Sequence, residues 1–257
     1  MIKFTKNTKV STMSQGYTGF TLAEVLITLT IIGVVAALTV PNLYAYYQKT
    51  QYVTQLKKVY SEISQAIKLL MADEGVNKLS ASNTLTFDEV SDYDEFIQGL
   101  GDNFFKKYFK VIKDCGTGYE CFANNYKTID ENNFSGITCS YSVIIASGAS
   151  ICTSQIASPS MPGDFFVDIN GLNPPNVAGR DLFSFSYYHD GSIDSFVSPE
   201  CRKGVPNSSG LLCFGHNSPK EARDYFFDNG EGTGCLKSTY GVGCFAKILN
   251  DNWKMDY

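Results

Sequence analysis

An unbroken apolar run near the start of the chain constrains its fold more than any other feature. It covers residues 20–40, FTLAEVLITLTIIGVVAALTV, and holds a single charged side chain, Glu24. A helix of this length rises about 30 Å, the thickness of the hydrocarbon core of a bilayer. The run therefore predicts one membrane-spanning helix in this part of the chain.

The flanks of this run predict its orientation. Lys3, Lys6 and Lys9 precede the run, which itself contains no lysine, so the positive-inside bias places residues 1–19 in the cytoplasm and the remainder outside. A secretory signal is cut after its apolar core, next to small residues. Here a small residue, Gly19, comes before the core, and Val40-Pro41-Asn42 does not resemble a signal-peptidase site. A plain single-pass anchor with an uncut tail is the simplest alternative interpretation.

Glu24 lies in an unfavourable place. A carboxylate four residues into an apolar helix costs several kcal/mol unless it is protonated, paired or able to reach the interface. If the chain is cut before Phe20, the new amine of one subunit can neutralise Glu24 of a neighbour that is offset along a filament axis. Such a contact would also fix the register between otherwise featureless apolar helices. Glu24 is therefore predicted to be an assembly residue.

The residues around this position resemble a known signature. Gly19-Phe20-Thr21-Leu22-Ala23-Glu24 and the run that follows are similar to the prepilin cleavage and methylation motif of type IV pilins and type II secretion pseudopilins. The resemblance implies that a membrane prepilin peptidase cuts after Gly19 and that Phe20 becomes N-methylated. It also implies an assembly role for Pro41, since proteins of this family often carry a proline in the first helix, where a proline removes one hydrogen bond and produces a kink.

Apolar residues continue at helical spacing beyond the run, at Val53, Leu56, Val59, Ile63, Ile67 and Leu70. The second half of the helix is thus predicted to be amphipathic and to dock its apolar stripe on a globular head. Gly75 is expected to end the helix at about residue 74. The predicted parts are a leader peptide (1–19), a helix (20–74, with 20–40 as membrane span and filament core) and an extracytoplasmic head (75–257).

The head is predicted to combine short helices with an antiparallel sheet. Between residues 88 and 113 the apolar residues recur at helical intervals, with breaks near Gly99 and Gly101 that predict two short helices. Residues 141–152, 165–169 and 182–197 are β-rich, and Asp190-Gly191 signals a type I′ hairpin turn. The predicted fold class is α+β and pilin-like: a long N-terminal helix, membrane-spanning in its first half and amphipathic in its second, packs on a disulfide-supported head with an antiparallel β-sheet.

All eight cysteines follow the apolar run. An even number of cysteines outside the membrane fits an oxidising compartment and a head supported by disulfides. Eight cysteines allow 105 pairings, among which the sequence alone does not choose. Pairing of sequence neighbours would join Cys115 to Cys121, Cys139 to Cys152, Cys201 to Cys213 and Cys235 to Cys244.

One stretch of the head is rich in oxygen-bearing side chains. Asp168, Asn170 and Asp181 belong to a pattern that resembles one found in a bacterial prepilin subgroup, and some major pseudopilins bind calcium in a C-terminal loop. The spacing is not that of an EF-hand, because Gly179 stands where the bidentate Glu should be. A calcium site that uses Asp168, Asn170 or Asp181 is one interpretation. Capping of turns by these side chains is the other, and the sequence favours it.

Other function classes find little support. The sequence contains no HExxH, no G-x-S-x-G and no P-loop, so no enzyme activity is expected. Apart from possible calcium, no cofactor is expected. Removal of the leader would change the net charge from −5 to −8, and the chain has no basic stripe, which argues against a nucleic-acid partner.

These features predict a structural subunit, a pseudopilin or minor pilin, of a type II secretion or type IV pilus filament. The expected partners are copies of itself or related pilins, prepilin peptidase and a membrane assembly platform. The precursor is expected to cross the inner (cytoplasmic) membrane once, with its leader in the cytoplasm, and the mature subunit to enter a periplasmic or cell-surface filament. The alternative is a monomeric, membrane-anchored binding or adhesion protein with an extracytoplasmic head.

Overall fold

The computed structural model describes residues 19–87, 92–134, 136–155, 163–195, 197, 199–204, 215–228, 234–236 and 243–257. The chain divides into two compact units, Met1–Tyr46 and Tyr47–Tyr257. Helix α1 (Leu22–Asp73) runs through the boundary, so its first part belongs to one unit and its second part to the other. A long N-terminal helix followed by an antiparallel sheet confirms the predicted α+β class.

Helix α1 ends as the sequence predicts. Gly75 adopts a left-handed conformation with φ +67°. Its N–H donates to Ala72 O at 3.2 Å, and Val76 N–H donates to Met71 O at 2.9 Å. This pair of hydrogen bonds is a Schellman motif, which satisfies carbonyl groups that a helix end leaves without partners.

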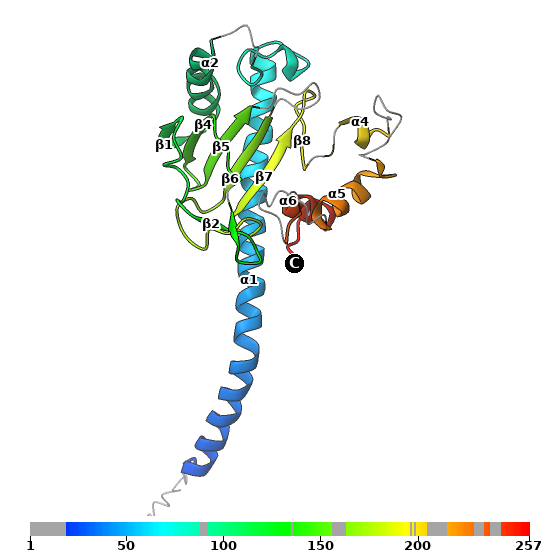
Figure 1. The fold of residues 1–257 in the computed structure, drawn as a ribbon. Coiled ribbons are helices and arrows are strands. Elements are labelled where there is room, and N and C mark those ends of the chain that lie inside the picture. Colours follow the sequence, from blue (N-terminus) through cyan, green and yellow to red (C-terminus); the bar gives the residue numbers. More distant parts are fainter. Residues whose placement is uncertain are drawn as a thin grey trace, which may run out of the picture. The chain divides into compact units, whose positions relative to one another are not determined.

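The second part of α1 carries a buried apolar stripe, because apolar residues three and four apart line one face of a helix. All six residues predicted for this stripe are buried, together with Ala66. They join the main core of the second unit, in which the helix packs on one face of the sheet (Figure 1). The stripe is made of Val53, Leu56, Val59, Ile63, Ala66, Ile67 and Leu70.

The main sheet is antiparallel throughout and has the order β1-β4-β5-β6-β7-β8. Strand β4 pairs with β5, β5 with β6, β6 with β7 and β7 with β8, so most neighbours in the sheet are also neighbours in sequence. A second, two-stranded sheet pairs β2 with β3. The strands are β1 (Val111–Gly116), β2 (Tyr126–Lys127), β3 (Asn133–Phe134), β4 (Tyr141–Ile145), β5 (Ser150–Gln155), β6 (Gly163–Asp168), β7 (Leu182–Tyr187) and β8 (Ile193–Asp194).

Both faces of the sheet are covered. Alternate residues of a strand point to opposite faces, and in β6 Phe165 and Val167 join the core that contains α1, whereas Phe166 joins a second cluster. This second cluster also holds Tyr126 of β2 and Leu182 of β7. The sheet is therefore the middle layer of the head.

The two short helices expected between residues 88 and 113 are in fact one helical stretch. Helix α2 (Tyr93–Gly99) continues through a π-helical turn, η2 (Leu100–Phe105), into α3 (Lys106–Tyr108). A Cβ on Gly101 would lie 2.2 Å from Tyr141 Oη. This glycine therefore provides room for Tyr141 rather than a break, and residues 111–113 belong to strand β1.

The predicted type I′ turn at Asp190-Gly191 is also wrong. Of these two residues only Gly191 has a positive φ, +76°, whereas a type I′ turn needs a positive φ at both central positions. Tyr188 N–H donates to Ser192 O and Gly191 N–H donates to Tyr188 O, both at 2.9 Å. The loop thus has three residues and closes with a left-handed glycine, another common hairpin connection.

Three helices follow strand β8 along the chain: α4 (Pro199–Arg202), α5 (Pro219–Asp228) and α6 (Gly243–Asn250). Asp194 of β8 is buried and accepts hydrogen bonds from Arg223 Nε at 2.9 Å and Nη2 at 2.6 Å. This two-pronged contact ties α5 to β8, and α6 packs on α5 and β7. A short 3₁₀ helix, η1 (Leu79–Ala81), lies before the sheet in the chain, shortly after α1.

Candidate functional site

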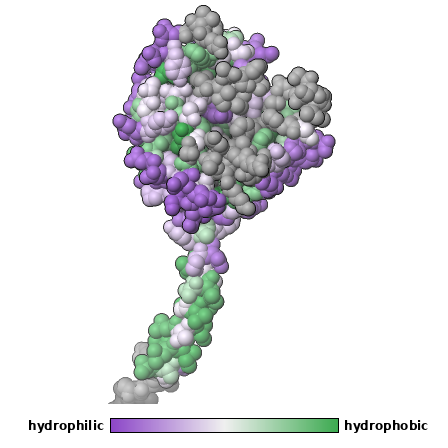
Figure 2. All heavy atoms as spheres, viewed as in Figure 1, coloured by the Kyte–Doolittle hydropathy of each residue, from purple (hydrophilic) through white to green (hydrophobic). Residues whose placement is uncertain are grey.

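The first part of α1 presents apolar side chains without any cover from its own unit. Figure 2 shows them along the face of the helix that is in view. By length and composition α1 could cross a membrane, and its most apolar window has no buried share. Such a surface needs lipid or protein around it. The exposed residues are Phe20, Leu22, Val25, Leu26, Ile27, Leu29, Ile31, Ile32, Val34, Val35, Leu38, Val40 and Leu43.

Polar side chains inside this apolar stretch bond to the helix itself. Each donates to a backbone carbonyl three or four residues earlier, so none of these hydrogen bonds needs water. This arrangement suits a surrounding that offers no other partners. The donors are Thr28 to Val25 O (3.0 Å), Thr30 to Leu26 O (2.8 Å), Thr39 to Val35 O (2.9 Å) and Asn42 to Leu38 O (3.4 Å).

Glu24 takes part in a reciprocal cap at the helix start. Its Oε2 accepts from both the backbone N–H and the Oγ1 of Thr21, each at 2.8 Å, and its own N–H donates to Thr21 Oγ1 at 3.2 Å. This is a capping box, which satisfies donors that the first turn would leave unpaired. The sequence analysis missed it, although the T-x-x-E spacing of Thr21 and Glu24 was a sufficient signal.

The other residues predicted for processing and assembly lie beside this cap or within the helix. Gly19 directly precedes Phe20, whose side chain is 88% exposed. Pro41 lies inside α1, which continues through it. Because proline has no N–H, the carbonyl of Ala37 loses its helical partner there. The roles predicted for Gly19, Phe20, Glu24 and Pro41 stay predictions.

Hydrogen bonds hold the two carboxyl groups of the loop that contains Asp168, Asn170 and Asp181, whereas the Oδ1 atoms of Asn170 and Asn176 are buried without a partner among the described residues. Asp168 accepts from Tyr126 Oη at 2.6 Å and from Asn170 N–H at 3.1 Å. Asp181 accepts from the N–H groups of Asn176 at 2.7 Å and Val177 at 2.6 Å. The four carboxylate oxygens therefore each have a donor. The bonds from the backbone N–H groups of Asn170, Asn176 and Val177 are local turn capping, whereas Tyr126 reaches Asp168 from strand β2.

This loop nevertheless disfavours negative charge. Both carboxyl groups are fully buried. Burial raises the pKa of Asp168 to about 8 and also raises the pKa of Asp181. Among the described residues no group of three His, Cys, Asp or Glu side chains could hold a metal ion. Calcium binding at Asp168, Asn170 and Asp181 stays a prediction.

Disulfides support the head in the described part of the chain. The structure joins Cys115 to Cys121, Cys139 to Cys152 and Cys235 to Cys244, three of the neighbour pairs considered from the sequence. Cys201 is also disulfide-bonded. The fourth pair considered would join it to Cys213, which lies outside the described residues.

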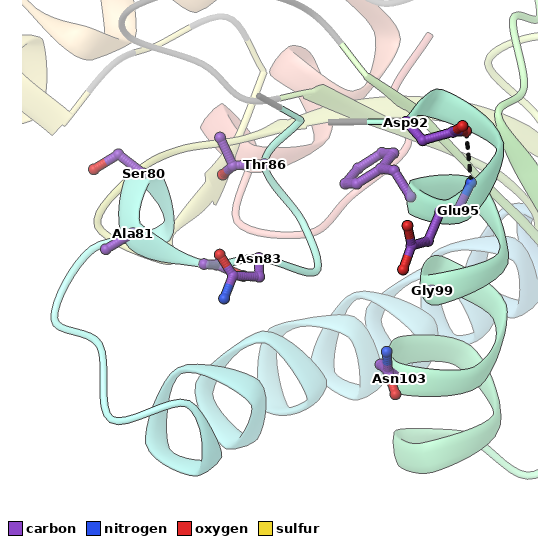
Figure 3. Close-up of a pocket in the computed structure, with 10 residues that line it drawn as sticks. Ser80, Ala81, Asn83, Thr86, Asp92, Glu95, Gly99 and Asn103 are labelled. Atoms are coloured by element: carbon purple, nitrogen blue, oxygen red, sulfur yellow. Dashed lines mark hydrogen bonds between the residues drawn. The ribbon is translucent and has the colours of Figure 1, made fainter. Parts of the chain in front are cut away.

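A polar hollow of about 450 Å³ lies between the segment after α1 and the helices α2 and η2 (Figure 3). Asn83 borders it on one side, and Glu95 and Asn103 border it on the other. Asp92 at its rim caps α2 by accepting from Asp94 and Glu95 N–H. Such a lining suits a small hydrophilic ligand better than an apolar one. No pattern in the sequence points to this hollow, because its lining comes from segments that meet only in the fold.

Comparison with known proteins gives one match. Residues 15–40 match the family model described as the prokaryotic N-terminal methylation motif, which marks type IV pilins and pseudopilins. No curated protein and no solved structure matches the chain. The matched residues include the capping box and the apolar stretch up to Val40, and none of them belongs to the head.

Proposed function

From an N-terminus that marks the type IV pilin and pseudopilin family, we propose that this chain is a structural filament subunit, a pseudopilin or minor pilin. Prepilin peptidase cuts the precursor after Gly19, and Phe20 becomes the methylated N-terminus. The mature subunits assemble through residues 20–40 into a type II secretion or type IV pilus filament. Partners are copies of this chain or related pilins and a membrane assembly platform.

The observation that carries this proposal is the methylation motif on an apolar helix segment in which no described residue is buried. In the precursor, lipid covers this helix. In the filament, neighbouring helices replace the lipid, so the same surface serves twice. The head needs no part of residues 20–46 for its core, because the buried stripe of α1 begins at Val53.

Glu24 sets the register of assembly in this proposal. Its Oε2 is held by Thr21, and its Oε1 has no partner among the described residues. A neighbour's N-terminal amine can therefore bind the same carboxylate without breaking the cap. A charge-assisted bond of this kind is stronger than one between neutral groups.

Two substitutions test the role of Glu24. Glu24→Val removes both charge and cap, whereas Glu24→Gln removes the charge but keeps a side-chain oxygen that can accept from the backbone N–H of Thr21. Both variants should be cut and methylated normally yet yield at least tenfold fewer filaments in the sheared fraction. Filaments at the native level with Glu24→Gln would show that neutralisation of an amine is not what Glu24 provides.

Mass spectrometry of the mature N-terminus tests the processing step. The expected terminus is N-methylated Phe20. A protein that retains Met1, or filament-free cells in which the anchored head still performs its task, would instead support the monomeric binding or adhesion protein considered above.

A further inference from the structure

We propose that Tyr44 and Tyr46 form an interfacial collar that binds the headgroup layer of the outer leaflet and sets the depth of the precursor in the membrane. This collar rests on the proposed function, since it concerns the precursor before it is cut. Its ligand is the ester and phosphate layer of phospholipids. Tyr44 directly follows Leu43, the last residue of the exposed apolar stretch, and Tyr46 lies two residues further on.

The two tyrosines are exposed on opposite sides of the helix. Tyr44 is 61% exposed and Tyr46 is 72% exposed. Residues two apart on an α-helix differ by about 200° around its axis. Lipid on either side of the helix therefore meets one of the two rings.

Hydrogen bonding marks Tyr44 as the point where the polar layer begins. The threonines and the asparagine described between Glu24 and Tyr44 all bond to the helix backbone. Tyr44 has no hydrogen-bond partner among the described residues. A tyrosine has an apolar ring and a polar hydroxyl, which is why tyrosines gather where hydrocarbon meets headgroups.

The spacing along α1 fits a bilayer with the collar at one surface. From Leu22 to Tyr44 the helix rises about 33 Å, close to the thickness of the hydrocarbon core. No charged residue lies between Glu24 and Lys49. Within this stretch, therefore, no charged side chain marks the point at which the membrane span ends on the outer side. With the tyrosines in the outer headgroup layer, the Gly19–Phe20 bond lies at the inner surface, where a cytoplasmic-side peptidase can reach it.

Depth-dependent quenching tests the position of the collar. The full-length precursor is reconstituted in phosphatidylcholine vesicles with bromines on either shallow or deep acyl carbons. Trp253 is the only tryptophan in the sequence, so the Trp253→Phe protein has no tryptophan fluorescence. Tyr44→Trp, Tyr46→Trp and Val34→Trp are introduced into it one at a time. Shallow bromines should quench the tryptophan fluorescence at both collar positions at least twofold more than deep bromines do. The fluorescence of Val34→Trp should be quenched more by deep bromines than by shallow ones. Equal or deeper quenching at the collar positions would overturn the proposal.

Cleavage by purified prepilin peptidase tests what the collar does. The Tyr44→Leu/Tyr46→Leu precursor should be cut several-fold more slowly than the native precursor, because the helix loses its outer stop. The matched Tyr44→Trp/Tyr46→Trp precursor keeps amphipathic rings and should be cut at the native rate. Native cleavage of the leucine variant would overturn the depth role. If the native precursor itself is not cut, the proposed function fails, while the quenching result still decides whether the collar exists.

Discussion

At the scale of single residues, Asp168 links a local contact to the pH dependence of stability. Burial raises its pKa to about 8, whereas an unfolded Asp has a pKa near 3.9. Between these values the folded state binds more protons than the unfolded chain, so the free energy of unfolding falls as pH rises. The contribution is present below about pH 4 and is lost as pH rises to about 8.

Asp168→Asn should flatten this decline. The variant loses a titrating group but keeps a side chain of the same shape. Burial raises the pKa of Asp164 and Asp181 as well, so part of the decline should remain. Urea unfolding at about pH 5 and about pH 8 measures the difference, with the exposed Asp102→Asn as control. An unchanged slope in Asp168→Asn would contradict the assignment.

Calcium that raises the melting temperature of the native protein but not of Asp168→Asn would support calcium binding at this loop.

Gly101 gives a second prediction at this scale. A Cβ at this position would overlap Tyr141, whose Oη donates to Asp114 Oδ2 at 2.8 Å. Gly101→Ala should therefore lower stability by about 1–3 kcal/mol, as overpacking of a core does. Gly99→Ala is the matched control, because its nearest neighbour atom would lie 3.7 Å away and its φ of −57° is helical. Thermal melts of the two variants should move in opposite directions or differ by several degrees.

At the scale of elements, the contact between β8 and α5 depends on one buried carboxylate. Asp194 is 2% exposed and binds Arg223, with Arg202 at 3.6 Å. Asp194→Ala would leave Arg223 largely buried without its acceptor, and breaking such a pair costs about 3–5 kcal/mol.

A surface pair provides the control for this substitution. The side chains of Asp102 and Lys106 are 66% and 47% exposed and lie four residues apart, so Asp102→Ala should cost no more than about 0.5 kcal/mol. Chemical denaturation compares the two variants. If the free energy of unfolding fell by a similarly small amount in both variants, the Asp194 contact would contribute little to stability.

The sequence predicts those elements whose signals are local. The stripe from Val53 to Leu70 follows from its spacing, and the end of α1 follows from Gly75. The turn at Gly191 and the π-helical turn at Gly101 were misjudged, because a glycine signals conformational freedom without revealing which neighbour needs the space. Asp194 and Arg223 lie 29 residues apart, so no pattern in the sequence pairs them.

The candidate site divides in the same way. Gly19, Phe20 and Glu24 could be selected because their motif is contiguous. The cap between Thr21 and Glu24 was equally local and could have been found. Tyr126 could not be linked to Asp168 beforehand, since the two residues are 42 positions apart in the sequence and meet only when the chain is folded.

At the scale of the whole molecule, the two units should separate without loss of the head's fold. None of the described residues before Tyr47 is buried, whereas seven residues from Val53 to Leu70 belong to the core. Each large aliphatic side chain in that stripe contributes about 1.5–3 kcal/mol when buried. Together the stripe contributes on the order of 10 kcal/mol, comparable to the entire stability of an ordinary domain.

A pair of truncations tests this division of α1. A chain lacking residues 1–46 should stay soluble without detergent and melt within a few degrees of the full-length protein in micelles. A chain lacking residues 1–74 loses the stripe and should not fold cooperatively. Circular dichroism melts of both, with disulfides intact, provide the comparison. If removal of residues 1–46 also abolished the cooperative transition, the first part of α1 would be stabilising the head. The same apolar surface could then not pass from the membrane to the filament while the head stayed folded.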